Sequence, residues 1–550
     1  QLADGQTTVK FVRPAHGLVA LHGADVVAVR ALGLDSGRTT HGHRFQGERD
    51  IALESAAHYE ARLEAPGNVI ADFDLRKAKI LAGLERGAAQ YAATLGPEAQ
   101  YAPLLEEVTA LVEMPTIYAG EFETQFLTVP PECLTLTMRQ NQKYFPLFDA
   151  SGKLTHRFLI VSNMRLDDPV NIVRGNERVI RPRLADARFF FETDKKVKLA
   201  DRVPQLATIV YHRKLGTQLE RVERLRRLAT RIQTMLPRAE KGRPYADRAA
   251  FLAKADLVTL MVGEFPELQG VMGKYYAEAD GEEPSVVRAI EQHYWPRFSG
   301  DALPSGDVSI ALALADKLET LAGIWGVGQQ PTGDKDPFGL RRAALGVLRI
   351  LSEKREAATL DLATLLNEAV AGFARGTLAS DTATALHAFM LERLRSLLKE
   401  KGYDANEIES VLADNPTCIQ RVWNRIEAVK VFRELPEAES LAAANKRIQN
   451  ILRKSGRSES VTPALLAQEE EKRLHTSMQS LGPRVDGHLE RQDFAAALKD
   501  LAGIRNDVDA FFEKVLVNVD DEKVRLNRLA LLTELGALMN RVADISKLAA

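Results

Sequence analysis

The sequence predicts a multidomain, predominantly α-helical chain with an α+β domain at its N-terminal end. Three observations support this fold class. Residues 1–165 alternate short β-type runs with turns, residues 166–336 carry apolar side chains mainly at helical spacing, and residues 337–550 are helical wherever a pattern can be read. The chain has 550 residues, of which 45% are hydrophobic, so it is long enough for roughly three or four domains.

The N-terminal region combines predicted strands with two predicted helices, at residues 51–65 and 72–95. The loop SGRTTHGHRFQG in the same region carries His41 and His43 beside Arg44. These residues favour either an anion- or RNA-facing loop or a polar turn whose side chains satisfy nearby backbone groups. The strands are expected within residues 10–23, 25–34, 121–130, 132–149 and 156–164.

The helical remainder shows apolar spacing at i, i+3 and i+4, for example in LERVERLRRLATRIQTML and TATALHAFMLERLRSLLKEKG. It is interrupted where Pro, Gly, Ser and charged residues accumulate. Breaks are predicted near residues 353–360, 401–406, 434–437, 454–463 and 481–488.

Residues 328–351, GQQPTGDKDPFGLRRAALGVLRIL, approach the G-x-x-x-x-G-K-[ST] pattern of a phosphate-binding loop. The two glycines have the required separation, but Asp334 occupies the position of the lysine. A carboxylate repels a triphosphate, so we expect no nucleotide site here. Asp336 is instead predicted to cap a helix whose first residue is Pro337.

The composition excludes several classes of protein. Two cysteines, Cys133 and Cys418, argue against a disulfide framework and a Cys-rich zinc site, and they fit a reducing compartment. No apolar run approaches the roughly 20 residues of a transmembrane helix. The formal net charge is −2, so the chain is not a polycation. Basic residues still cluster in 174–188 and 213–227, where they either bind phosphates or cover exposed helices.

The motifs H-E-x-x-H, C-x-x-C, G-x-S-x-G and G-x-G-x-x-G are absent from the sequence. His212, Asp256 and Asp316 remain as weak candidates for a metal site, because hydrolytic metal sites combine imidazoles with carboxylates. The adjacent His-Asp pair of metal-dependent HD phosphohydrolases is missing. We therefore expect no catalytic residue and no metal, and a metal-dependent HD-type phosphohydrolase is kept as an alternative.

The C-terminal third places basic residues around apolar helical faces. In AAANKRIQNILRK, Lys446 and Arg447 lie beside Ile448, Ile451 and Leu452. A bundle with basic residues and Asn at its exposed edges can hold an RNA backbone and read unstacked bases. The segment VDAFFEKVLVNVDDEKVRLNRLALL adds further cations at Lys514, Arg525 and Arg528.

Long and unusual motifs resemble the β subunit of bacterial heterotetrameric glycyl-tRNA synthetase. They are FVRPAHG, GRTTHGHRF, NQKYFPLFD, GNERVIRPRLADARFFFETD, GEFPELQGVMGKYYA, DPFGLRRAALGVLRIL, NKRIQNIL, VDAFFEKVLV, VRLNRLALL and VADISKL. The likeness runs over nearly the whole chain. The family's chains usually carry a further segment before FVRP, so we expect an N-terminally truncated form.

The resemblance implies an order of domains. Residues 1–165 would adopt the editing-module-like fold also found in phenylalanyl-tRNA synthetase, and residues 166–336 would form a degenerate HD-like helical domain. Residues 337–550 would end in a DALR-type anticodon-binding domain, at about 440–550, shared with arginyl-tRNA synthetase. Glycine is the smallest amino acid, so a glycine-binding site already excludes larger amino acids sterically, and a separate editing site would add little. We expect a structural or tRNA-contacting role for the first domain.

The resemblance also implies a function. The chain would be the tRNA-recognition subunit required, with the α subunit, for ATP-dependent attachment of glycine to its tRNA in the cytoplasm. Two α and two β subunits would assemble, and the α subunit would hold ATP, Mg and glycine, so no cofactor is expected in this chain. Neither a membrane nor DNA is an expected partner. A non-catalytic RNA-binding or assembly protein is the second alternative.

The candidate tRNA contacts are the basic residues of three regions. They are Arg44 in the N-terminal loop, Arg181, Arg183, Arg188, Arg341 and Arg342 on the acceptor side, and Lys446, Arg447, Lys514, Arg525 and Arg528 on the anticodon side.

Overall fold

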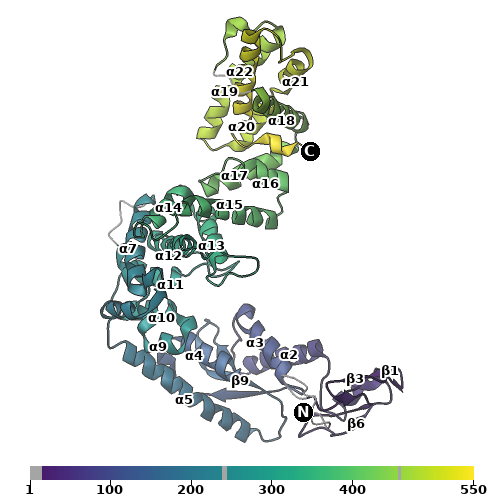
Figure 1. Cartoon of the computed structure of the whole chain (residues 1–550). Helices are drawn as coiled ribbons and strands as arrows, with labels where there is room; N and C mark the ends of the chain where they lie inside the picture. The colour runs from purple at the N-terminus through teal and green to yellow at the C-terminus, as the bar shows by residue number, and fades with distance from the viewer. Residues whose placement is uncertain (1–14, 238–244, 456–459, 550) are drawn as a thin grey trace. The chain divides into compact units, whose positions relative to one another are not determined.

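The computed structural model describes residues 15–237, 245–455 and 460–549 (Figure 1). The chain divides into two compact units. Unit 1 comprises Gln1–Lys196 and Gly263–Leu268, and unit 2 comprises Val197–Val262 and Gln269–Ala550. This division differs from the boundary predicted after residue 165, because helix α5 (Val170–Asp194) belongs to unit 1.

Unit 1 is built on an antiparallel sheet with the strand order β7-β9-β8. Its strands are β7 (Thr116–Glu121), β8 (Phe145–Phe148) and β9 (Leu154–Ser162). Helices α2 (Phe73–Ala89) and α3 (Glu98–Leu111) cover one face and share an apolar core with it. Helix α5 lies on the other side of the sheet, where the Tyr144 hydroxyl donates to Asn176 Oδ1 of α5 (Figure 1).

The N-terminal part of unit 1 is a set of small hairpins. Leu53 and Leu63 form its buried cluster together with Ile51. A further helix, α1 (Tyr59–Glu64), follows these hairpins. The strands are β1 (Leu21–His22), β2 (Asp25–Val26), β3 (Arg30–Ala31), β4 (Leu34–Asp35), β5 (Thr39–Thr40) and β6 (Ile51–Ala52).

Several of the predicted elements in unit 1 were wrong. The predicted strand at 121–130 is largely a 3-10 helix, η2 (Thr124–Thr128). The predicted strand at 132–149 begins as helix α4 (Pro131–Leu136) and the π-helix η3 (Thr137–Asn141), and only its last part is strand, as β8. Pro131 at the first helical position favours the helix. Leu134 and Met138, four residues apart, are both fully buried, so tertiary packing overrides their β-type neighbours.

Other predictions for unit 1 were partly confirmed. The predicted helix at 51–65 begins instead as strand β6, while α2 confirms the helix predicted at 72–95. Strand β9 confirms the strand predicted at 156–164. The part of the first predicted strand at residues 10–14 lies outside the described residues.

At two helical glycines in unit 1, we expect substitution by Ala to change stability in opposite directions. A Cβ at Gly83 of α2 would lie 2.7 Å from Ile117 Cγ1, whereas a Cβ at Gly175 of α5 would meet nothing within 4 Å. Ala is favoured over Gly in a helix by roughly 1 kcal/mol. We therefore expect Gly175→Ala to stabilise unit 1 by about 0.5–1 kcal/mol and Gly83→Ala to destabilise it by about 1 kcal/mol, because overpacking outweighs propensity.

Urea unfolding monitored by circular dichroism measures both changes, and each variant serves as the control for the other. Equal shifts of the two unfolding midpoints would contradict the close packing of α2 on β7.

Unit 2 is helical and is organised around α12 (Asp307–Gly326), whose side chains are buried along nearly its whole length. Three helices that precede α12 in the chain pack on it: α7 (Gln218–Met235), α8 (Tyr245–Leu252) and α11 (Pro284–Gln292). Later helices that pack on it are α13 (Leu340–Glu353), α14 (Leu362–Val370) and α15 (Thr382–Glu400). Unit 2 also contains α6 (Leu199–Arg202), α10 (Val271–Ala279) and the short strands β10 (Val210–His212) and β11 (Gly216–Thr217). The division between the units falls within α9 (Leu260–Glu264).

The C-terminal part of unit 2 is a helical bundle. Within it, α18 contacts α21 and α22, and α19 contacts α20, α21 and α22. The bundle and the helices that precede it are α16 (Ala405–Leu412), α17 (Ile419–Arg433), α18 (Ala438–Ser455), α19 (Glu469–Glu490), α20 (Phe494–Ala502), α21 (Arg505–Lys514) and α22 (Glu522–Met539). In the part of the chain that the structure describes, no helix is long and apolar enough to cross a membrane.

The predicted helix breaks at 353–360, 401–406 and 434–437 are confirmed by the ends of α13, α15 and α17. The break predicted at 454–463 includes residues 456–459, which lie outside the described residues. The break predicted at 481–488 was wrong, because α19 continues through Pro483. Leu481 and Val485 are buried on either side of the proline, and this packing offsets the missing N–H.

The helix predicted to start at Pro337 begins at Leu340 instead. The N-cap residue is Gly339 and not Asp336 as predicted, although the Asp336 carboxylate accepts hydrogen bonds from the amides of Leu340 and Arg341 at 2.9 Å each. Gly339 has φ +66°, a backbone conformation that glycine adopts without strain. The chain therefore turns between Asp336 and the first helical residue.

Candidate nucleic-acid interface

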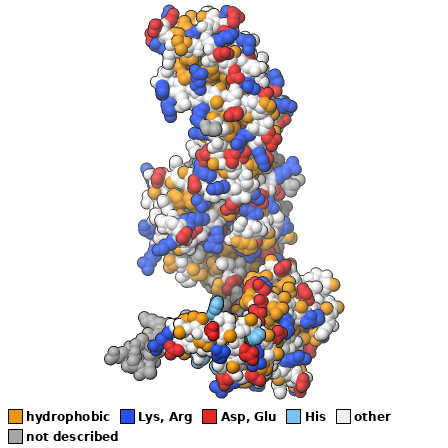
Figure 2. Space-filling view, turned by 90° about the vertical axis from the view of Figure 1, so that its right-hand side faces the viewer, with side chains coloured by type: hydrophobic (Ala, Val, Ile, Leu, Met, Phe, Trp, Pro, Cys, Tyr) orange, Lys and Arg blue, Asp and Glu red, His pale blue; other side chains and the backbone are white. Residues whose placement is uncertain are grey.

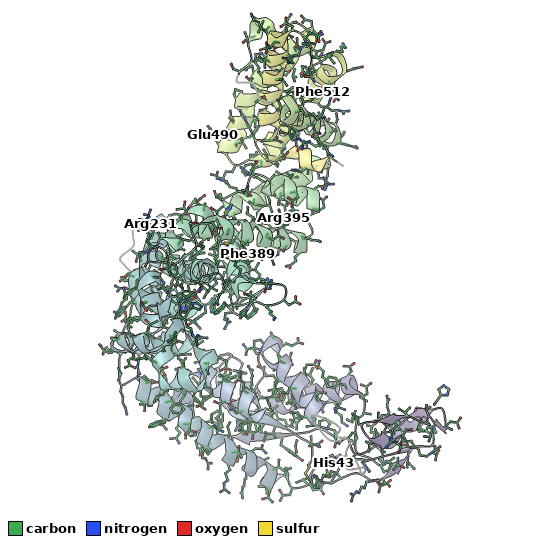
Figure 3. The ribbon with its side chains drawn as sticks, viewed as in Figure 1. His43, Arg231, Phe389, Arg395, Glu490 and Phe512 are labelled. Atoms are coloured by element: carbon green, nitrogen blue, oxygen red, sulfur yellow. The ribbon has the colours of Figure 1, made fainter. Side chains whose placement is uncertain are left out.

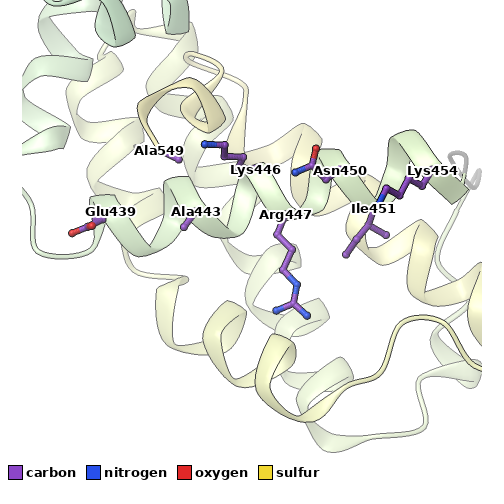
Figure 4. Close-up of a pocket in the computed structure, with 8 residues that line it drawn as sticks. All are labelled: Glu439, Ala443, Lys446, Arg447, Asn450, Ile451, Lys454 and Ala549. Carbon is purple, nitrogen blue, oxygen red and sulfur yellow. The ribbon is translucent and has the colours of Figure 1, made fainter.

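A shallow basic groove runs along the exposed face of α18 (Figure 4). Its volume is about 450 Å³. Lys446, Arg447 and Lys454 provide three cations, against the single carboxylate of Glu439. Asn450 adds an amide, and the remaining lining residues are Ala443, Ile451 and Ala549.

The opposite face of α18 holds the helix in place. Leu441, Ile448 and Leu452 are buried, and the helix packs against α21, α22 and the C-terminal 3-10 helix η10 (Ile545–Leu548). This confirms the predicted apolar face for Ile448 and Leu452, while Ile451 is half-buried and lines the groove. With one face fixed in the core, residues at i, i+4 and i+7 on the other face must point to solvent.

The guanidinium group of Arg447 lies over a neighbouring aromatic ring. Its carbon atom lies 4.4 Å from the centre of the Phe512 ring, which belongs to α21 and is labelled in Figure 3. Phe511, beside it, is fully buried. Arginine planes and aromatic rings are the groups on which unstacked RNA bases stack, and lysines bind the phosphates between them. The groove therefore has the chemistry to hold a single-stranded segment of RNA.

The other residues predicted for the anticodon side do not join this groove. Lys514 donates to Glu470 at 2.9 Å, and Arg525 lies 3.9 Å from Glu522. Arg528 is only 5% exposed, and it donates to Glu471 and to the backbone oxygen of Leu516. Arg528 is therefore a buried structural cation rather than a surface contact.

The residues predicted for the acceptor side lie in both units. In unit 1, Arg181 pairs with Glu123 at 2.6 Å, Arg188 donates to Gln125 at 2.9 Å, and Arg183 is exposed. In unit 2, Arg341 donates to the backbone oxygen of Gly333, and Arg342 is exposed. Figure 2 shows basic and acidic side chains interspersed over the face that it presents.

The histidine loop of unit 1 is largely explained by local hydrogen bonds. His43 is buried, its Nε2 lies 2.6 Å from Asn163 O, and its Nδ1 accepts the N–H groups of Phe45 and Gln46. Nε2 therefore carries the proton and donates to Asn163, which favours the polar-turn interpretation over a ligand-facing histidine. Arg44 is exposed and lies 5.4 Å from the ring of Phe45.

The weak metal candidates do not form a metal site. Among the described residues, no three His, Cys, Asp or Glu side chains are grouped so that they could hold a metal ion. Asp316 Oδ1 is instead paired with Arg221 and Lys254, each at 3.0 Å. His212 Nδ1 accepts the Lys214 N–H, and Asp256 Oδ2 accepts the amides of Gly270 and Gly273.

Asp316 and Lys254 belong to a layer of buried charged groups, which we call the buried charge layer: Arg221, Lys254, Asp256, His293, Asp316 and Glu319. Lys254 Nζ lies 2.7 Å from His293 Nε2, and Arg221 Nε donates to Glu319 Oε2 at 2.9 Å. The ammonium of Lys254 therefore lies between an imidazole nitrogen and a carboxylate, two groups that otherwise favour a metal ion.

The electrostatics of this layer follow from burial and pairing. Burial lowers the pKa of Lys254 to about 8, although Asp316 opposes the shift. Burial alone would raise the pKa of Asp316, but Lys254 and Arg221 outweigh it and hold that pKa well below its ordinary value. Burial raises the pKa of Asp256 to about 6, against the opposing hydrogen bond from Gly270. Burial also keeps the pKa of His293 well below its ordinary value.

Two groove residues, Asn450 and Lys454, were not among the predicted tRNA contacts. Both lie at helical spacing from Lys446 and Arg447, so the periodicity of NKRIQNILRK could have identified them. The partner ring of Phe512 could not be found in this way, because it lies on a separate helix.

Comparison with known proteins identifies the bundle that carries the groove. Residues 441–546 match the family model of the DALR anticodon binding domain. The C-terminal bundle is therefore of the anticodon-binding class. Residues 2–413 match the family model of the glycyl-tRNA synthetase beta subunit.

Individual relatives agree with the second match. The glycine–tRNA ligase beta subunit of Aromatoleum aromaticum is 57% identical over 549 residues, which cover 99% of this chain and 78% of the relative. The beta subunit of Thiobacillus denitrificans is 53% identical over 553 residues, covering 100% and 78%. That of Ralstonia nicotianae is 53% identical over 543 residues, covering 98% and 76%. The chain belongs to the glycyl-tRNA synthetase beta subunit family.

Proposed function

We propose that this chain supplies tRNA recognition to glycine–tRNA ligase. With an α subunit as partner, it would support the ATP-dependent attachment of glycine to its tRNA in the cytoplasm. One observation supports the proposal: the cations of the basic α18 groove lie within the residues that match an anticodon-binding domain. These residues, 441–546, also contain the contact between Arg447 and Phe512.

We further infer a division of labour with the α subunit. ATP, Mg and glycine would be held by α, in an assembly of two α and two β subunits. The helical middle, residues 166–336, would be a non-catalytic scaffold of degenerate HD type. This inference is supported by the cationic surroundings of Asp316, whose Oδ1 is already paired with Arg221 and Lys254.

Arg447→Ala tests the proposed recognition surface. The substitution removes a cation and the guanidinium plane that lies over Phe512, so we expect binding of glycine tRNA to weaken by about 1–2 kcal/mol, or about 5- to 30-fold. Fluorescence anisotropy with labelled glycine tRNA measures this change in the complex with the α subunit.

The matched control is Arg484→Ala in the same bundle. Arg484 is exposed and pairs with Asp500, and it does not line the groove. Both variants change the net charge equally, so nonspecific electrostatics affect them alike. Equal affinities for the two variants would exclude the α18 groove as the tRNA contact.

A further inference from the structure

Four arginines follow one face of helix α5 in unit 1. Arg174, Arg178, Arg181 and Arg188 are separated by four, three and seven residues. At 3.6 residues per turn, these positions fall within about 80° of one another and extend over about 21 Å. We call them the α5 arginine stripe. Arg183, on the same helix, lies on the opposite side, about 180° from Arg174.

The helix is held so that this stripe stays exposed. Ile180, Leu184 and Ala187 are fully buried on a different face, which packs in the core of unit 1. Arg174 and Arg178 are exposed, and within the described residues neither has an ion pair or hydrogen-bond partner. The buried face of α5 fixes the orientation of the helix, and Arg174 and Arg178 therefore face solvent on another side of it.

The carboxylates near the stripe are already engaged. Arg181 pairs with Glu123, while Glu177 of the same helix accepts the N–H of Glu121 at 3.0 Å. Glu192 lies near the stripe at the end of the helix and pairs with Lys195. Among the described residues, neither Arg174 nor Arg178, at the start of α5, forms an ion pair with a carboxylate.

We propose that the α5 arginine stripe binds the ribose-phosphate backbone of the tRNA, as a contact separate from the α18 groove. This proposal rests on the proposed function, which supplies the RNA. Every cation of the stripe is arginine, whose planar fork matches phosphate oxygens in a bidentate manner. A linear row of guanidinium groups over about 21 Å suits an extended polyanion better than a single small anion. No base-reading amide lies among the four, so the contact positions the RNA and does not select its sequence.

The experiment compares salt dependence in stripe variants and a control on the same helix. Arg178→Gln and the double variant Arg174→Gln/Arg178→Gln are assembled with the α subunit and titrated with a glycine tRNA transcript at several salt concentrations. Arg183→Gln is the control: the sequence alone grouped Arg183 with the acceptor-side contacts, but this exposed residue lies about 180° from Arg174 on α5 and is not part of the stripe. None of the three residues makes a stabilising contact, so circular dichroism should show an unchanged fold.

We expect the slope of log affinity against log salt to fall by about 0.7–0.9 for each stripe arginine removed. The double variant should also bind roughly 10-fold more weakly near 0.1 M salt, whereas Arg183→Gln should leave both quantities unchanged. Equal slopes for all variants and the wild type would overturn the proposal. If the wild-type complex still binds glycine tRNA in that experiment, the proposed function stands. Failure of the wild-type complex to bind glycine tRNA would overturn both.

One further outcome distinguishes RNA from protein as the occupant. If the double variant keeps its tRNA affinity and slope but loses association with the α subunit, measured by sedimentation, the stripe docks an acidic protein surface. That result would also overturn the proposal.

Discussion

Replacing Asp316 with Asn is expected to destabilise unit 2 by about 3–5 kcal/mol. The carboxylate is the shared partner of Arg221 and Lys254, and all three side chains are buried. Removing one member of a buried ion pair leaves an uncompensated charge in a medium that solvates it poorly. Arg221 keeps Glu319 as a partner, but Lys254 loses its ion pair and keeps an imidazole, the ring of Tyr294 and the nearby charge of Asp256.

The effect of Asp316→Asn should depend on pH in a defined direction. The folded-state pKa of Asp316 is depressed below its ordinary value of 3.8, so the stability that its charge contributes is present above about pH 4. That contribution is lost as pH falls through the folded-state pKa. The difference between wild type and variant should therefore be full at pH 7 and should narrow under strongly acidic conditions.

Asp486→Asn is the matched control for this prediction. Asp486 also pairs with an arginine, Arg541, but the side chain of Asp486 is 55% exposed. Surface pairs of this kind contribute about 0–1 kcal/mol. Urea unfolding midpoints measure both variants, and comparing midpoints avoids assuming a single two-state transition for a chain with two units. Similar midpoints for Asp316→Asn and Asp486→Asn would contradict the buried network.

The sequence predicted the helical regions well where apolar periodicity and local capping agree. Asp336 illustrates this, because its carboxylate accepts hydrogen bonds from the first amides of the next helix even though that helix starts three residues later than expected. The failures occur where packing overrides local signals. Pro483 lies inside α19 because buried neighbours hold the helix together, and the β-type residues near Cys133 are helical because they fill a core.

The buried charge layer could not be predicted from the sequence, since its members come from distant segments. Asp316 lies in the run ALALADKLETLAG, which reads as an ordinary amphipathic helix with an exposed charged face. In the structure, α12 is surrounded by other helices, so the same charges are buried and must find partners. The metal hypothesis was based on residue types that bind metals. The sequence did not reveal that Lys254 lies between His293 and Asp316 in the fold.

The candidate RNA surfaces were predicted only in part. Lys446 and Arg447 were identified from their helix alone and do lie in one groove. Arg528 was included for the same reason, yet it is buried against Glu471, because charge and spacing do not reveal which side of a helix meets the core. The stripe on α5 becomes apparent only when burial of Ile180 and Leu184 fixes the orientation of the helix.

Asp256→Asn is expected to stabilise the fold, whereas the same chemical change at Asp316 in the same layer is expected to destabilise it. Asp256 is fully buried; its Oδ2 accepts two backbone amides, and its Oδ1 has no hydrogen-bond partner. An asparagine can present its oxygen to both amides while removing the buried negative charge. Burial raises the folded-state pKa of Asp256 from 3.8 to about 6, which marks the carboxylate as unfavourable in the fold.

The sign of the pH dependence follows from this shift. The folded chain binds the Asp256 proton more tightly than the unfolded chain, so this group's contribution to stability falls as pH rises from about 4 to about 6. The penalty is complete above pH 6, where it amounts to at most about 3 kcal/mol at 1.36 kcal/mol for each pKa unit. Asp256→Asn should therefore be more stable than wild type at pH 7 by about 1–3 kcal/mol, and equal to it near pH 4. Thermal unfolding of both proteins between pH 4 and pH 8 tests the prediction, and a variant that is less stable at pH 7 would mean that Lys254 and the two amides fully compensate the charge.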